Sequence, residues 1–361
     1  RLVKAFVECP YRRYQDYPHW VPPLRRDELR RLSPRHNPFL EHATITPWLA
    51  RSDGRVAGRI AAIDDRLHDD THHERVTWFG FFEADDDPAT TRALLGAVEA
   101  HARRRGSALV RGPANPSLNE SAGLLINCFD EAPYLLMPYN PPEYQALIEG
   151  AGYRKIKDLL AWSVDLRVPL PARVARIAER VRARHHLVIR PLDLKAFDRD
   201  LACMQHIYRE AWHDNWGFVP PTDAEIRQLA RDLGPVLDPN LVLFAEIGGK
   251  PVACAVTLPN INQVLKRMNG RLLPFGLIHF LRRKSIVDQV RLVLLGVLPE
   301  VRRIGLYPLL AAESYQRAAA TGYTDGEMSW TLEDNEVINA GIEAVGGRRS
   351  KTYRLYEKPL G

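Results

Sequence analysis

VRLVLLGVLPEVRRIGLYPLL, residues 290–310, passes from an apolar strand through a short basic turn into the start of a helix. A strand that runs through a tight turn into a helix leaves the first backbone N–H groups of that helix unpaired, and these groups attract an anion. Arg302 and Arg303 add positive charge, and Gly305 closes the turn. The stretch therefore predicts a site for a pyrophosphate group, with a basic surface turn as the alternative.

The whole chain of 361 residues has an ordinary globular composition, with 45% hydrophobic and 26% charged residues. Its length favours two domains, because a single core seldom grows past about 250–300 residues. No segment approaches the roughly 18 uninterrupted apolar residues of a membrane span. The four cysteines form no CxxC pair, so we expect reduced thiols and no metal site. Since no signal-peptide pattern is present either, we expect a cytoplasmic protein.

Two halves of the chain repeat the same order of elements, which indicates an internal duplication. The corresponding segments are 52–65 with 247–260 (turn and strand), 76–82 with 291–297 (strand), 93–105 with 308–320 (helix), 108–111 with 324–329 (strand), and 147–165 with 341–359. Each half thus contains a strand–helix–strand crossover and is expected to end in a hairpin after a helix-terminating glycine. We predict an N-terminal domain at 1–168, a helical linker at 169–185 and a C-terminal domain at 186–361.

Each half also carries an insertion, at about 112–142 in the earlier half and 259–288 in the later one. The later insertion contains an apolar stretch at 272–281 with basic residues on both sides, and the chain as a whole has a net charge of +6. Ten apolar residues cannot span a bilayer, but they can lie at an anionic membrane surface or line a channel for an acyl chain. We expect 266–284 to be a peripheral membrane contact, with burial against the other domain as the alternative.

The turn at 302–305 resembles that of the GCN5-related N-acetyltransferase (GNAT) family, whose motif [Gln/Arg]-x-x-Gly-x-[Gly/Ala] holds the pyrophosphate of coenzyme A with its backbone amides. Arg302 and Gly305 match this motif, whereas Tyr307 replaces its last residue. The resemblance implies an α/β (α+β) fold of two fused GNAT-like domains, each a twisted, mainly antiparallel mixed sheet flanked by helices. It also implies that the later half binds acyl-CoA through Gly296, Val297, Leu298, Arg302, Arg303, Ile304, Gly305, Leu306 and Asn335.

Both halves depart from the family pattern. The family places a general-acid Tyr near the end of its fourth helix, where this chain has Ile342 in the later half and Ile148 in the earlier one. The turn of the earlier half reads EADDDP at 83–88, and its four acids would repel a phosphate by like charge. We therefore expect the later half alone to bind the cofactor, although the acidic run also suits a helix cap before Pro88.

Four further segments, 112–123, 137–144, 152–158 and 211–220, are similar to a bacterial family of tandem GNAT-like proteins. Some members of that family are ceramide synthases, which transfer a fatty acyl group from acyl-CoA to a sphingoid base. The resemblance implies an acyl-CoA-dependent N-acyltransferase whose acceptor is a lipid amine, with no metal and no nucleic-acid partner. Two other functions stay open: an aminoacyltransferase that uses aminoacyl-tRNA, and a non-catalytic CoA or lipid sensor. Acyl chain length and oligomeric state stay open too.

N-acyl transfer requires a neutral amine, a polarised thioester carbonyl and a stabilised thiolate. Glu327 is the candidate base, with a structural ion pair as the alternative role. Tyr307 is the candidate acid, with packing beneath the cofactor as the alternative. Two loops rich in donor and aromatic side chains are the candidate acceptor site, with a satisfied loop network or core packing as the alternative. Their residues are Asn115, Asn119, Tyr139, Asn140, Tyr144, Trp212, Asn215 and Trp216.

Overall fold

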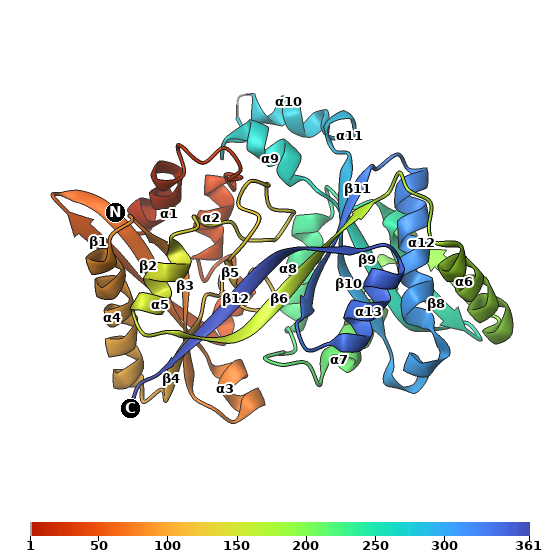
Figure 1. The fold of residues 1–361 in the computed structure, drawn as a ribbon, viewed down its shortest axis with the longest axis horizontal. Coiled ribbons are helices and arrows are strands. Elements are labelled where there is room, and N and C mark those ends of the chain that lie inside the picture. Colours follow the sequence, from red (N-terminus) through yellow and green to blue (C-terminus); the bar gives the residue numbers. More distant parts are fainter. Residues whose placement is uncertain (1, 274) are drawn as a thin grey trace.

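The computed structural model describes residues 2–273 and 275–361. Arg1, in the predicted N-terminal domain, and Pro274, in the predicted membrane contact, lie outside the described residues. Figure 1 shows an elongated molecule in which β6 and β12 cross between two groups of helices and strands.

The N-terminal half begins with two helices and continues with a hairpin and a crossover. Its elements are α1 (Leu2–Arg13), α2 (Arg25–Arg31), η1 (Pro38–Glu41), β1 (Ala43–Ser52), β2 (Arg55–Asp65), α3 (Arg66–His72), β3 (Val76–Ala84), α4 (Pro88–Arg105), β4 (Leu109–Gly112), β5 (Leu124–Leu125), α5 (Tyr144–Gly150) and β6 (Arg154–Asp165).

The C-terminal half repeats this order after α6 (Ala172–His185). Its elements are β7 (Val188–Pro191), η2 (Leu194–Ala196), α7 (Phe197–Trp212), α8 (Asp223–Leu233), η3 (Pro239–Leu241), β8 (Val242–Ile247), β9 (Lys250–Pro259), α9 (Asn262–Met268), α10 (Gly276–Leu281), α11 (Arg283–Ile286), β10 (Gln289–Val297), η4 (Pro299–Ile304), α12 (Leu306–Ala320), β11 (Asp325–Leu332), α13 (Glu336–Ala344) and β12 (Arg348–Pro359).

The expected hairpins at the start of each half and the expected crossovers are present, which confirms the predicted fold class. The β1–β2 hairpin turns at Asp53 and Gly54, and the β8–β9 hairpin turns at Gly248 and Gly249, all four with positive φ. Each crossover joins two parallel strands through a helix, β3–α4–β4 and β10–α12–β11. Antiparallel pairs predominate elsewhere, so each half is a mixed sheet.

The last strand of each half lies in the other half. The described strands form one sheet in the order β1-β2-β3-β4-β12-β6-β11-β10-β9-β8-β7, with β5 beside β12. The expected terminal hairpins were wrong, because β6 and β12 are single 12-residue strands without an internal turn. They pair with each other, and each also pairs with a strand of the opposite half, β11 or β4. The division at 168 and 186 stays a prediction.

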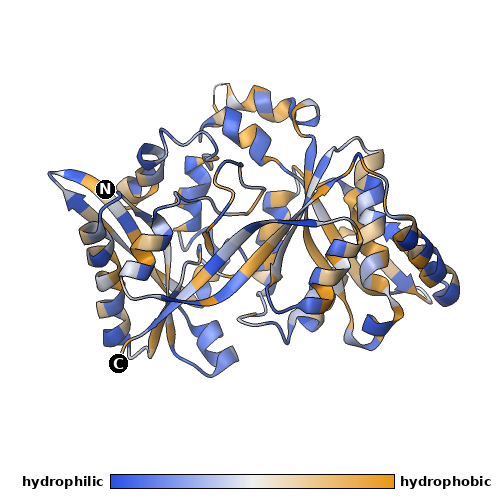
Figure 2. Ribbon diagram, in the orientation of Figure 1, coloured by the Kyte–Doolittle hydropathy of each residue, from blue (hydrophilic) through white to orange (hydrophobic). Residues whose placement is uncertain are grey.

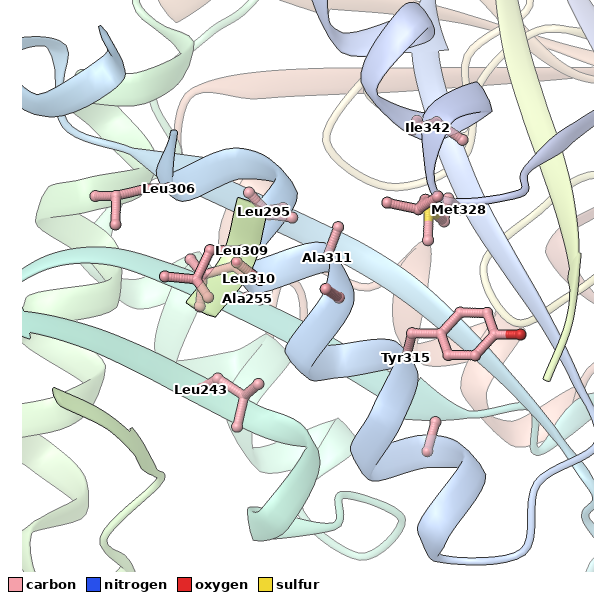
Figure 3. Close-up of a cluster of buried hydrophobic side chains, with 14 of the residues drawn as sticks. Leu243, Ala255, Leu295, Leu306, Leu309, Leu310, Ala311, Tyr315, Met328 and Ile342 are labelled. Carbon is pink, nitrogen blue, oxygen red and sulfur yellow. The ribbon is translucent and has the colours of Figure 1, made fainter. Parts of the chain in front are cut away.

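Helices cover both faces of the C-terminal part of the sheet. On one face α12 packs over the buried side chains Leu243, Ala255 and Leu295, as Figure 3 shows, and α6 packs beside α12. On the other face α7 contributes Ile207 to a separate cluster with Phe244. Among the described residues, no helix is both long enough and apolar enough to cross a membrane.

Candidate functional site

Strands β10 and β11 separate in the middle of the sheet. They pair in parallel only from Gln289 to Leu292 and from Asp325 to Met328. Beyond this point β10 pairs with β9 on one edge, and its register shifts next to Val293. Within the described chain, the other edge of Leu294–Val297 has no strand beside it. Its backbone groups are therefore available to a ligand.

The turn after β10 leads into a helix whose amino end is uncapped. Gly305 has φ +87°, a conformation that suits glycine, and no side chain in the described chain caps α12. Arg302 and Arg303 on this turn are exposed, and Arg302 Nη2 donates to the carbonyl of Ala211 at 3.0 Å. Free N–H groups, two arginines and the open edge of β10 thus meet at one place, which suits an anion.

The corresponding place in the N-terminal half is closed by the chain itself. Strands β3 and β4 also separate, after Trp78 and Arg111, but the insertion fills the space: Ala114 N donates to Phe79 O at 3.0 Å, and Asn115 Oδ1 accepts from Phe81 N. A Cβ on Gly80 would lie 1.7 Å from Ala114 O. The acceptor role expected of Asn115 therefore competes with a structural one.

The acidic turn of the N-terminal half also caps the amino end of α4, the helix that follows it. Asp87 accepts from the N–H groups of Ala89 and Thr90 at 3.0 and 2.9 Å, so it caps α4 as the alternative interpretation expected. A hydrogen bond from the Thr90 hydroxyl, together with these two from backbone N–H groups, lowers the pKa of Asp87. An ionised carboxylate thus occupies the place that a phosphate would take, in contrast with the amino end of α12.

The end of α7 covers the turn of the C-terminal half. A Cβ on Gly296 would lie 2.8 Å from Trp212 Cζ3, so the indole lies directly over β10. Arg302 bonds the residue before this tryptophan. The structure therefore brings Trp212 together with Gly296 and the predicted cofactor turn. Val297 and Leu306 are buried, so they offer backbone groups rather than side chains.

The candidate acid Tyr307 and Ile342, which stands where the family has its general-acid Tyr, both face apolar surroundings. Tyr307 packs against the core cluster of the C-terminal half, and burial raises the pKa of its phenol. Ile342 is buried in the same cluster, near Met328, as Figure 3 shows. Asn335 caps α13, where its Oδ1 accepts from Ile338 N at 3.3 Å. These contacts favour the packing role for Tyr307.

Glu327 lies where β10 and β11 begin to separate. It is 2% exposed, pairs in register with Arg291, and accepts a 2.5 Å hydrogen bond from Ser329 Oγ. Arg291 Nε donates to Ser329 Oγ at 2.8 Å and lies 4.0 Å from Glu327 Oε1, while its Nη1 donates to Leu135 O at 2.6 Å. Burial raises the pKa of Glu327, which the Arg291 guanidinium opposes. The network joins the separating strands to the N-terminal insertion.

Three of the predicted acceptor residues are held inside the N-terminal half. Asn140 is buried and bonds both backbone groups of Leu125, at 2.7 and 3.0 Å. Tyr144 is fully buried, and its hydroxyl donates to Glu83 Oε2 at 3.0 Å. Tyr139 Oη donates to Phe129 O at 2.8 Å. Their hydrogen bonds correspond to the satisfied loop network that was the alternative.

The remaining predicted acceptor residues meet where the two halves touch. Asn119 Nδ2 donates to Val219 O at 2.8 Å, and its Oδ1 accepts from Tyr208 Oη at 3.1 Å. The Trp216 ring lies under the Arg111 guanidinium at 5.4 Å, and Asn215 is half-buried in the same loop. A small cavity at this seam is lined by 116–119, Trp78 and His68 of the N-terminal half and by Gly217 and 219–221 of the C-terminal half.

Arg291 and Ser329 were not predicted as site residues from the sequence. The available signal was a single arginine inside the apolar run VRLVLLGV, since a charge in a buried strand requires partners. Ser329 carried no such signal, because its hydrogen bond to Arg291 depends on the register of β10 against β11. Among the described residues, no group of three or more His, Cys, Asp or Glu is placed to hold a metal.

The chain is similar to two known proteins over nearly its whole length. It is 38% identical to the bacterial ceramide synthase of Caulobacter vibrioides, covering 99% of this chain and 95% of that protein. It is 36% identical to Protein YghO of Escherichia coli, covering 99% and 93%. No family model matches the chain.

Among solved structures, a tandem GNAT protein from the clavulanic acid biosynthesis pathway matches with a TM-score of 0.60 and 14% identity, covering 100% of this chain and 95% of the other. A GCN5-related glucosamine N-acetyltransferase region of a fungal multi-domain GH3 beta-N-acetylglucosaminidase matches with a TM-score of 0.59 and 14% identity, covering 98% of this chain and 37% of the other. At these identities the likeness shows the fold alone.

Proposed function

The chain belongs to the family of the bacterial ceramide synthase and has the tandem GNAT fold, and from this premise we propose that it transfers a long-chain acyl group from acyl-CoA to a lipid amine such as a sphingoid base. The observation that carries the proposal is the uncapped amino end of α12 beside the open edge of β10. In the N-terminal half Asp87 caps the corresponding helix, and the insertion fills the corresponding gap between strands.

The residues at this place fit the coenzyme. Gly305 keeps the turn tight without a side chain over the helix end, and Arg302 and Arg303 supply positive charge for a pyrophosphate. The backbone of 294–297 offers hydrogen-bonding groups along the path of a pantetheine arm. Trp212 closes the end of β10 from the α7 side. The proposed cofactor site therefore runs from Gly296 to Leu306.

The reaction forms a C–N bond as the amine attacks the thioester carbonyl, and it breaks the C–S bond, so that CoA leaves as a thiolate that takes up a proton from water. One proton leaves the amine nitrogen. We assign Ser329 Oγ to receive this proton and Glu327 to take the serine proton in turn, because the two groups share a 2.5 Å hydrogen bond. Arg291 positions Ser329 through its Nε and stays protonated. Backbone N–H groups near Gly296 polarise the carbonyl.

In this proposal the surface around α10 is a peripheral membrane contact. Such a contact suits an enzyme whose acceptor is a lipid. Leu273, Phe275 and Leu281 are 68%, 72% and 68% exposed, although they are large and apolar. Figure 2 shows hydrophobic residues along α10 at the edge of the molecule. Exposed basic residues surround them, namely Lys266, Arg267, Arg271, Arg282 and Lys284. This combination suits an anionic lipid surface.

Replacing Phe275 and Leu281 with glutamate is expected to lower partitioning onto vesicles of phosphatidylcholine and phosphatidylglycerol by about tenfold or more. Each change removes apolar area worth about 1.5–3 kcal/mol when fully buried and adds a charge repelled by the anionic lipid. Sedimentation with vesicles measures the effect. Leu194→Glu is the matched control, because Leu194 is 61% exposed in another part of the chain. Equal binding by the double variant and the wild type would refute the contact.

The proposed activity is tested by incubating the purified protein with acyl-CoA of several chain lengths and sphinganine. We expect ceramide by mass spectrometry, and a rise in melting temperature with CoA but not with tRNA. A tRNA effect without a CoA effect would favour the aminoacyltransferase. Binding of CoA without product at any chain length would identify a non-catalytic sensor, which Ile342 in place of a tyrosine favours.

A further inference from the structure

The hydroxyl group of Tyr353 is buried without a hydrogen-bond partner. Tyr353 lies in β12 and is 0% exposed, and its Oη has no partner in the described parts of the chain. Burial holds the pKa of this phenol well above its ordinary value, so the hydroxyl stays protonated at neutral pH. Buried hydroxyl groups in folded proteins are normally paired, because an unpaired one costs free energy. The structure thus presents a protonated donor that suits a ligand.

Tyr353 lies on the same face of the sheet as the proposed base. Tyr353 pairs with Leu159 of β6, and Glu327 pairs with Ser163 of the same strand. Leu159 and Ser163 are four residues apart, so side chains in these two rows point to one face. The charges of Glu327 and Arg291 both act on the phenol, the first raising its pKa and the second lowering it. The unpaired hydroxyl is therefore close to the group that takes up the amine proton.

One segment of the N-terminal insertion, residues 128–136, covers this part of the sheet. Within it Leu135 O accepts from Arg291 Nη1 at 2.6 Å, and Glu131 Oε2 accepts from Lys351 Nζ at 2.6 Å. Lys351 is 1% exposed, whereas the Glu131 side chain is 58% exposed. The first and last residues of the segment have φ of 54° and 64°, a conformation that side chains other than glycine rarely adopt. The buried polar groups thus lie one residue below the surface where Lys351 meets Glu131.

We propose that Tyr353 Oη donates a hydrogen bond to a hydroxyl group of the acceptor, on a carbon next to the one that carries the amine. This inference rests on the proposed function, because it requires an acceptor whose amine lies at Ser329. Only two carbon atoms separate such a hydroxyl from the amine nitrogen, so it enters the same buried cluster when the amine is bound. A lipid with an amine alone leaves Tyr353 unpaired, and a buried group that one substrate pairs and another does not discriminates strongly between them. Tyr353 thus selects amino alcohols over simple amines.

The test compares sphinganine with its two analogues that lack one hydroxyl group, 1-deoxysphinganine and 3-deoxysphinganine, as acceptors of a long-chain acyl group from acyl-CoA. We expect wild-type kcat/KM to be at least about tenfold lower for one of the two analogues. Tyr353→Phe should lower kcat/KM for sphinganine to that level and leave kcat/KM for the analogue unchanged. The melting temperature of the variant should not fall, because the free chain loses no hydrogen bond within its described residues.

Tyr153→Phe is the matched control. Tyr153 is 2% exposed, and its Oη too has no hydrogen-bond partner within the described chain. Its ring packs against Phe79 in the core of the N-terminal half, away from the proposed base. This variant should keep both the wild-type rate and the preference for sphinganine.

Three results overturn the inference while leaving the proposed function intact. One is equal kcat/KM for sphinganine and both analogues in the wild type. Another is a preference for sphinganine that survives in Tyr353→Phe. The third is a loss of activity in Tyr353→Phe toward all three acceptors alike. If the wild type acylates none of the three amines, the proposed function itself fails, and the inference fails with it.

Discussion

Replacing Gly305 with valine is expected to lower the affinity for CoA by about 100-fold or more. Gly305 has φ +87°, which a β-branched residue avoids, and a Cβ there would lie 3.1 Å from Val181 Cγ2. Relief of this strain turns the N–H groups at the start of α12 away from the pyrophosphate. The loss of one or two hydrogen bonds to a charged group, each worth about 1.5–3 kcal/mol, accounts for the size of the effect.

The same substitution at Gly322 separates binding from backbone strain. Gly322 follows the opposite end of α12 and has φ +98°, with nothing within 4 Å of its Cβ position. Gly305→Val and Gly322→Val should both lose about 1–3 kcal/mol of stability in chemical unfolding. Calorimetry should show weakened CoA binding for Gly305→Val alone. Wild-type affinity in Gly305→Val would place the pyrophosphate elsewhere.

Local patterns made most of the elements of each half predictable. The two hairpin turns, the crossovers and the Asp87 cap depend on residues close together in the chain. The exchange of β6 and β12 was not predictable, because the residues of each strand indicate a buried strand but not which half it joins. A pairing between strands far apart in the sequence leaves no local signal.

The candidate site also contains one part that could be predicted from the sequence and another that could not. The turn around Gly305 is contiguous, so its chemistry could be recognised from the sequence. Asn140 and Tyr144 have the same donor groups as an acceptor site, but their partners, Leu125 and Glu83, are set by tertiary packing. Tertiary packing likewise decides that Asn115 fills the gap between the strands of the N-terminal half.

Replacing Glu327 with glutamine is expected to lower kcat by about 100-fold or more, the usual contribution of a general base. Glutamine keeps an acceptor for Ser329 Oγ, so the hydrogen bond at 2.5 Å can be retained while the proton acceptor is lost. Only the ionised carboxylate takes a proton, and burial raises the pKa of Glu327. Wild-type kcat/KM should therefore fall as the pH drops through a value above the ordinary range of glutamate, and this fall should be absent in the variant.

Glu83→Gln is the matched control for that experiment. Glu83 is a buried acid of the N-terminal half, it accepts from Tyr144 Oη at 3.0 Å, and burial raises its pKa too. It lies 3.5 Å from Arg59, so it also resembles Glu327 in having an arginine close by. If both variants lose stability but only Glu327→Gln loses kcat and the acidic fall in kcat/KM, the proton path through Ser329 is supported. If Glu327→Gln keeps both, the carboxylate and Arg291 form a structural ion pair that holds β10 and β11 together where they separate, and the base must be sought elsewhere.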